Sequence, residues 1–343
     1  MELPPDDHQA VGVPGPGEED RRGALHLLRR LHRRRGDVVL REARLLAIGG
    51  GKGGSGKSFL ALNMGVALTE RGKEVVLFDA DLGGANLHTM LGITFPPVTL
   101  EDFLLQRLKA LREASIETPV KGLRLITGPI LSLLSNLKYR QKRKLFRSLK
   151  SLEADYVIID LGANLVSSTL DLFLLADRGL LLLTPEPTSI ENAYRFLRGV
   201  YFRGLSSAAT ERSIKRLVER VMEHLEPELR APLDLLRKLE ALDGTTASRF
   251  REVLKALRPC VVLNQVKKRE EATLGFSVKT LCRKYFGLEV SYLGYIPYDP
   301  KVSYSVEKGR PFLWEYPTTE VSRCIREIAH RIQTGREMPH PQG

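Results

Sequence analysis

The feature that most constrains the fold of this chain is a glycine-rich octapeptide, GKGGSGKS, at positions 51–58. It follows a short apolar run, Leu45–Gly49, and opens a helical pattern over Ser58–Arg71. Glycines let backbone N–H groups curl around phosphates, and a helix N-terminus adds partial positive charge. The segment matches G-x-x-x-x-G-K-[ST], a loop that holds a nucleoside triphosphate. A strand–loop–helix unit of this kind indicates an open α/β sheet.

The residues of this loop have separate predicted roles. Lys57 is expected to contact the β- and γ-phosphates, and the Ser58 hydroxyl to bind Mg²⁺. The other cradle residues are Gly51, Lys52, Gly53, Gly54, Ser55 and Gly56. The stretch also spells G-x-G-x-x-G, with Asp79 where a dinucleotide fold places its ribose carboxylate. The Lys–Ser pair favours the triphosphate, because a pyrophosphate site needs neither group there.

Short apolar runs alternate with helical patterns from Arg44 onward, which is typical of a mostly parallel sheet covered by helices. Several runs are continuous Val, Ile and Leu, as in strands buried on both faces. The seven predicted strands are Leu45–Gly49, Glu74–Phe78, Leu123–Thr127, Tyr156–Leu161, Gly179–Thr184, Cys260–Gln265 and Val290–Ile296. The predicted fold is therefore an α/β P-loop protein with helices on both faces of one sheet.

Composition divides the chain into segments. Residues 1–20 are acidic and proline-rich, as in a disordered tail. Residues 21–43 begin with seven arginines in fifteen positions, interleaved with leucines, and predict a basic amphipathic helix and linker. This helix fits docking on the main domain or contact with an anionic partner. The P-loop domain is placed at 44–333, with a helical insertion at about 200–258 that suits packing or partner recognition, and 334–343 form a polar tail.

Charge and cysteine content exclude several classes of protein. There are 53 Lys and Arg against 41 Asp and Glu, a net charge of +12 that suits anionic partners. Cys260, Cys282 and Cys324 are far apart and offer neither a disulfide framework nor a CxxC metal pair. The most apolar stretch is interrupted by charges, and the acidic N-terminus is unlike a secretory signal. A cytoplasmic protein is expected.

Two acidic segments end apolar runs, at the sheet edge where open α/β folds bind ligands. The second run ends in Asp79-Ala80-Asp81 and the fourth in Asp160. Asp160 is expected on the Mg²⁺ side of the site, and Asp81 is a candidate for orienting the attacking water. Taken singly, each aspartate would fit a helix cap or a turn. Together with the glycine-rich loop they indicate a hydrolytic Mg²⁺ site.

A second lysine in the loop, Lys52, gives K-G-G-x-G-K-S, and the chain thereby resembles the deviant Walker A ATPases of the MinD/ParA group. FDADLGGAN (78–86) and YVIIDLGAN (156–164) resemble the two switch segments of that family. TPEPTSIENAY (184–194) and LGYIPYDPKV (293–302) are similar to segments of its FlhG-like branch, which acts in flagellar number and placement.

The resemblance implies an ATPase that forms an ATP-dependent homodimer with the nucleotides between the subunits. Lys52 would act in trans on the partner's nucleotide, as an arginine finger does. Asn264, in VVLNQV, and the turn at Pro297 would hold adenine. ATP and Mg²⁺ are the implied cofactors, and an activating protein is the implied partner. Such an enzyme would hydrolyse ATP to ADP and phosphate and regulate the placement or number of a flagellum, a division site or another cargo.

Other features bear on the surface that such a switch would use. The chain end, 334–341, is too polar and proline-broken for a membrane-binding helix, so membrane contact through the C-terminus is not expected. Basic residues crowd a predicted helix at 137–152, which fits a solvated face or nonspecific DNA on the nucleoid. Asn164 stands in the second switch where the family pattern has Gly.

Two further classes remain as alternatives. A metabolic P-loop enzyme, such as an ATP-dependent carboxylate ligase of the dethiobiotin synthetase or cobyric acid type, shares the fold and part of the loop. ATP turnover accelerated by a small carboxylate would favour it. An electron-donating iron protein of the nitrogenase type would need paired cysteines between subunits. The three cysteines of this chain fit small buried apolar residues instead.

Overall fold

The computed structural model describes residues 42–50, 53–81, 84, 86–127, 139–163, 165–209, 211–222 and 231–340. Several predicted features lie outside these ranges. They are the acidic tail 1–20, the basic helix within 21–41, and the single residues Gly51, Lys52 and Asn164. Their predicted roles are therefore not addressed by the fold.

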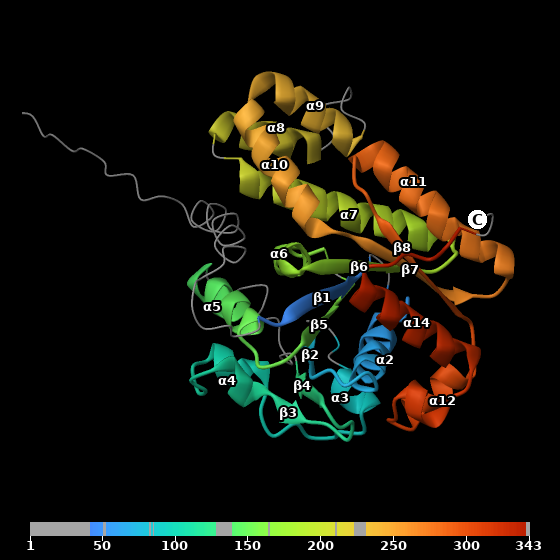
Figure 1. The fold of residues 1–343 in the computed structure, drawn as a ribbon. Helices are drawn as coiled ribbons and strands as arrows, with labels where there is room; N and C mark the ends of the chain where they lie inside the picture. The colour runs from blue at the N-terminus through green and yellow to red at the C-terminus, as the bar shows by residue number, and fades with distance from the viewer. Residues whose placement is uncertain are drawn as a thin grey trace, which may run out of the picture.

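One eight-stranded sheet forms the centre of the described structure, in the order β3-β4-β2-β5-β1-β6-β7-β8 (Figure 1). Its strands are β1 (Arg44–Gly49), β2 (Val75–Ala80), β3 (Ile116–Glu117), β4 (Leu123–Ile126), β5 (Tyr156–Leu161), β6 (Arg178–Leu183), β7 (Cys260–Val266) and β8 (Ser291–Pro297). All neighbours are parallel except β3 and β4. The seven predicted strands are confirmed to within two residues. β3 was not predicted, because two residues are too few to show a period.

Helices cover both faces of the sheet, as predicted (Figure 1). They are α2 (Lys57–Thr69), α3 (Leu87–Met90), α4 (Leu100–Leu104), α5 (Tyr139–Lys150), α6 (Ser167–Leu175), α7 (Pro187–Ala208), α8 (Arg212–Met222), α9 (Pro232–Leu242), α10 (Gly244–Leu257), α11 (Leu274–Phe286), α12 (Lys301–Glu307), α13 (Phe312–Glu315) and α14 (Glu320–Thr334). One apolar cluster joins the sheet to α2 and α14, and the other joins it to α5, α6 and α7. Alternate residues of each central strand face the two clusters.

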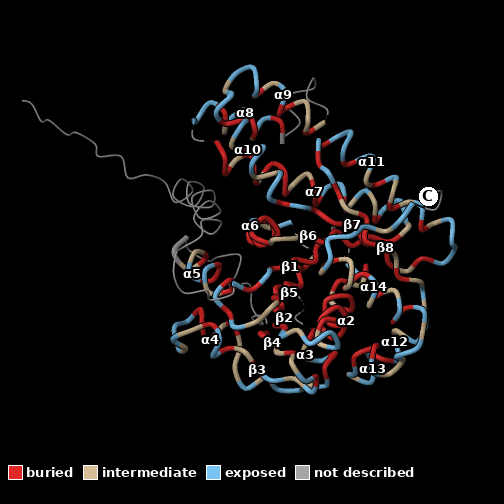
Figure 2. Tube along the Cα trace, in the orientation of Figure 1, coloured by how far each residue is buried: buried red, intermediate tan, exposed pale blue. Residues whose placement is uncertain are grey.

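Helix α2 is apolar on nearly all sides. Eleven of its thirteen residues are buried, because the sheet covers one side and α14 the other (Figure 2). Arg326 on α14 forms a bidentate ion pair with Glu70, at 2.6 and 2.9 Å. The backbone N–H of Leu313 donates to Asn63 Oδ1 at 3.1 Å. The C-terminal helices therefore hold the helix that follows the glycine-rich loop.

The segment expected to form a helical insertion, about 200–258, contains α8, α9 and α10, between β6 and β7. They stand on α7, which begins before the expected boundary at about 200. The Tyr201 ring lies 4.7 Å from Phe250 and 5.8 Å from Phe286, measured between ring centroids. Aromatic packing of this kind gives the insertion a continuous connection to the core.

The basic helix predicted at 137–152 is α5, and part of its charge is structural. Lys142 is buried 3.8 Å from Asp171 of α6, and Lys150 is buried 3.7 Å from Asp177. Lys144 lies over the Phe103 ring, 4.5 Å from its centroid. Nonspecific DNA binding by this helix stays a prediction. Two of its lysines, Lys142 and Lys150, form ion pairs within the protein.

Helix α14 ends at Thr334, the residue where the polar tail was expected to begin, and Gly335 caps it. The segment after it returns to the domain: the Met338 N–H donates to the Tyr292 carbonyl at 2.8 Å, and Lys279 pairs with Glu337 at 2.5 Å. Within the described residues, every helix is too short or too polar to span a bilayer.

Candidate functional site

The glycine-rich loop connects β1 to α2 and lies at the carboxyl edge of the sheet. Gly54 has φ +76° and Gly56, which caps α2, has φ +90°, both in the left-handed region that favours glycine. A Cβ atom on Gly50 would stand 2.4 Å from the Leu182 carbonyl oxygen. Gly54 and Gly56 are therefore explained by their backbone conformation, and Gly50, just before the loop, by the lack of space for a Cβ atom.

Lys57 is the first residue of α2 and is nearly buried, with 8% of its surface exposed. Burial lowers the pKa of its ammonium group, while the carboxylates of Asp160 and Asp81 oppose that shift. The charges of two predicted acidic residues therefore act on the lysine that is predicted to bind phosphates.

The carboxylates come from two adjacent strands, β2 and β5, where Asp79 and Asp160 are directly paired in register. Burial raises the pKa of Asp79 to about 7. It also raises the pKa of Asp160 to about 8, with the charge of Asp79 as the second cause. The Ser58 hydroxyl donates to Asp160, and Lys57 favours its ionised form. Two buried carboxyl groups this close disfavour a second negative charge unless a cation joins them.

The Oδ1 atom of Asp160 is buried and has no hydrogen-bond partner among the described residues. The adjacent Ser58 hydroxyl supplies a second hard oxygen. Hydroxyl and carboxylate oxygens are the ligands that Mg²⁺ prefers. The residues present therefore fit the predicted metal.

Asp79 organises the chain after β2. Its carboxylate accepts hydrogen bonds from the backbone N–H groups of Asp81 and Leu87, both at 3.2 Å. The Asp81 carboxylate in turn packs against Gly162, where an added Cβ would lie 2.5 Å from Asp81 Oδ1. The two predicted switch segments thus meet at this contact. The sequence analysis gave Asp79 as an alternative ribose ligand and as the first residue of the acidic segment Asp79-Ala80-Asp81, but not as the acceptor that orders the chain after β2.

The residues predicted to hold adenine lie at the ends of neighbouring strands. Val266 of β7 is paired with Pro297 of β8. Asn264 directs its amide to the loop, where Nδ2 donates to the Ser55 carbonyl at 2.8 Å, and Gln265 Nε2 donates to the Gly54 carbonyl at 3.1 Å. Gln265 is a contact that sequence reasoning missed. The adenine role of Asn264 and Pro297 stays a prediction.

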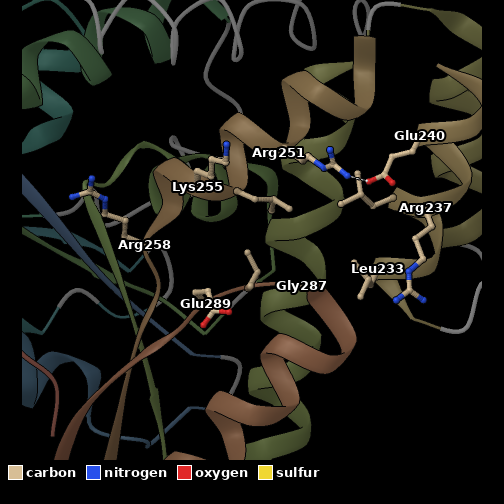
Figure 3. Close-up of a pocket in the computed structure, with 11 residues that line it drawn as sticks. Leu233, Arg237, Glu240, Arg251, Lys255, Arg258, Gly287 and Glu289 are labelled. Atoms are coloured by element: carbon tan, nitrogen blue, oxygen red, sulfur yellow. Dashed lines mark hydrogen bonds and ion pairs between the residues drawn. The ribbon is translucent and has the colours of Figure 1, made fainter. Parts of the chain in front are cut away.

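A hollow of about 600 Å³ lies between helices α9 and α10 of the insertion and the turn after α11 (Figure 3). Figure 3 shows Arg251 and Glu240 facing each other across its rim, at 2.5 Å. The lining includes Arg258, two residues before β7 begins, whereas the glycine-rich loop contacts the opposite end of that strand. The hollow is therefore separate from the site described above.

A mostly parallel sheet, a glycine-rich loop opening a buried helix, and a lysine among carboxylates at the carboxyl edge define a P-loop nucleotide-binding protein. Within this class, the chain belongs to the family described as the CobQ/CobB/MinD/ParA nucleotide binding domain, whose model matches residues 46–312. The predicted family and fold class are confirmed.

Individual relatives are similar to this chain over most of its length. The antiactivator FleN of Pseudomonas aeruginosa is 26% identical over 303 residues, covering 87% of this chain and 89% of FleN. The septum site-determining protein MinD of Synechocystis is 27% identical over 303 residues, covering 86% and 91%. MinD of Pyrococcus horikoshii, solved with Mg-ADP, superimposes with a TM-score of 0.57 at 21% identity, covering 84% and 96%.

Proposed function

We propose that this protein is an ATP-hydrolysing switch that regulates the placement or number of a cellular structure. The observation that carries the proposal is the cluster of two buried residues, Lys57 and Asp160, and two half-buried ones, Ser58 and Asp81, at the end of a family P-loop. Among relatives, one MinD determines a septum site by name, and another was solved with Mg-ADP. ATP and Mg²⁺ are accordingly the proposed cofactors.

We propose a role in hydrolysis for each of these residues. The N–H groups of the loop and Lys57 bind the phosphates, in a site where low solvent exposure strengthens each charge interaction. Ser58 and Asp160 would hold Mg²⁺, which when bound neutralises the charge of the β- and γ-phosphates. Asp81, supported by Asp79 and seated on Gly162, would orient the attacking water.

Dimerisation is the remaining part of the proposal. Lys52 would complete the partner's site, as in the family that the loop resembles, and two subunits would close on two nucleotides. A switch of this kind passes between two states whose populations ATP changes, and an activating protein would return it to the nucleotide-released state. We propose action in the cytoplasm, with transient association with the nucleoid or the inner membrane surface.

Sizing of the purified chain with Mg-ATP tests this function. Asp81→Ala should block hydrolysis and accumulate the dimer, whereas Lys52→Ala should bind ATP as a monomer. A monomer under all conditions, in a protein that binds ATP, would contradict the switch. Acceleration of ATP turnover by a small carboxylate would favour a metabolic ligase instead.

Imaging of the tagged protein, native and Lys57→Ala, tests the cellular role. The native protein should concentrate at a pole, at midcell or on the nucleoid, and the variant should lose that position because it cannot bind nucleotide. A uniform distribution of both would contradict a placement function.

A further inference from the structure

The end of strand β7 presents two consecutive amide side chains to the glycine-rich loop. Asn264 donates to the Ser55 carbonyl and Gln265 to the Gly54 carbonyl, at 2.8 and 3.1 Å. The pairing of β7 with β8 shifts register between Leu263 and Val266, so both residues lie in the irregular step. The bulge turns both side chains of adjacent residues toward one ligand-binding loop, which a regular strand would not do.

These two hydrogen bonds fix the direction of N–H groups in the loop. The carbonyl and the N–H of one trans peptide unit lie in a plane and point in opposite directions. A donor on the Gly54 carbonyl therefore orients the Ser55 N–H, and a donor on the Ser55 carbonyl orients the Gly56 N–H. N–H groups of such loops bind the phosphates.

Gln265 occupies a backbone conformation that its side chain does not favour. Its φ is +57°, in the left-handed region that residues with a Cβ adopt at a cost. Strain of this kind persists where the surroundings impose it, and it gathers at ligand-binding sites. Among the described residues, Gln106 and Arg258 are the other non-glycine residues with positive φ. Gln265 differs from both in that its side chain contacts the loop.

We propose that Gln265 is a positioning residue for phosphate binding. Its amide holds the Gly54 carbonyl outward, so that the Ser55 N–H faces the phosphate site before the ligand arrives. Donors that are already oriented strengthen binding because the ligand does not have to order them. The inference rests on the proposed binding of a nucleoside triphosphate and specifies how the loop achieves it.

Two substitutions in the full chain separate this role from a purely structural one. Gln265→Ala and Gln265→Gly are titrated with Mg-ATP, Mg-GTP and inorganic tripolyphosphate. Both variants should bind all three ligands about three- to tenfold more weakly, which corresponds to one hydrogen bond. The ratio of ATP to GTP affinity should not change, because Gln265 acts on the phosphates. Gln265→Gly should melt at a higher temperature than Gln265→Ala, since glycine tolerates the left-handed conformation.

Gln106 provides a matched control, because it is the same residue type, is exposed, and has φ +62°. Gln106→Ala and Gln106→Gly should show the same order of melting temperatures with unchanged ligand affinity. Wild-type affinity for tripolyphosphate in both Gln265 variants would overturn the inference and leave the proposed function intact. A change confined to the ATP to GTP ratio would overturn it in favour of base contact. A wild-type chain that binds none of the ligands would refute the proposed function, and the inference with it.

Discussion

Replacing Asp79 by asparagine is expected to flatten the pH dependence of folding stability. Asp79 is fully buried, and burial raises the pKa of its carboxyl group from 3.8 to about 7. The protonated group is favoured in the folded state, so this contribution to stability is complete below the unfolded pKa. It is lost as the pH rises through the folded pKa.

The size of the effect follows from the gap between the two pKa values. A gap of about three pKa units lowers the free energy of unfolding by about 4 kcal/mol once Asp79 is ionised in both states. About 2–3 kcal/mol of this decrease occurs between about pH 5 and pH 8. The amide has a single oxygen, so the N–H of Asp81 or of Leu87 loses its acceptor. That loss costs about 1–3 kcal/mol at every pH and does not change the slope.

Urea denaturation at several pH values, without Mg²⁺ or nucleotide, measures this slope. Between about pH 5 and pH 8 the wild-type free energy of unfolding should fall by about 2–3 kcal/mol more than that of Asp79→Asn. Asp160 is the register partner of Asp79, so the observed steps belong to the pair. Val76→Ala, on the same strand, is the control and should lower stability equally at each pH. Parallel pH curves for wild type and Asp79→Asn would refute the reasoning.

Three further substitutions test other contacts. Gly162→Ala places a Cβ 2.5 Å from Asp81 Oδ1; steady-state kinetics should show at least about a hundredfold slower hydrolysis, with ATP affinity nearly unchanged in titrations. Gly56→Ala, at φ +90°, places a Cβ 2.3 Å from the Asn264 amide nitrogen and should abolish nucleotide binding in a protein with a native circular dichroism spectrum. Asp171→Ala removes the bidentate partner of the mostly buried Arg203 and should lower the free energy of unfolding by about 3–5 kcal/mol in urea.

The sheet and the loop could be predicted because their signals are local. The run Tyr156–Ile159 is unbroken and apolar and is followed by Asp160, and the loop motif fixes the spacing of its glycines and its lysine. The strand order places β2 beside β5, which brings together acidic residues that the sequence shows only one at a time.

The missed features are long-range contacts. Gln265 meets Gly54 across a separation of 211 residues, and no local pattern marks a side chain that satisfies a distant carbonyl. The charges of α5 predicted an exposed basic face, but Lys142 finds its carboxylate on α6. A charge pattern shows which face of a helix is polar and not which neighbour it meets.

The cover that α14 gives to α2 has a consequence for synthesis of the chain. The phosphate-binding helix is made early, but its outer apolar side stays bare until the polypeptide reaches Ile332, the last buried residue of α14. A nascent or prematurely terminated chain therefore exposes the apolar side of α2 beside the glycine-rich loop. Loading with nucleotide is expected only after the ribosome has delivered the final helix.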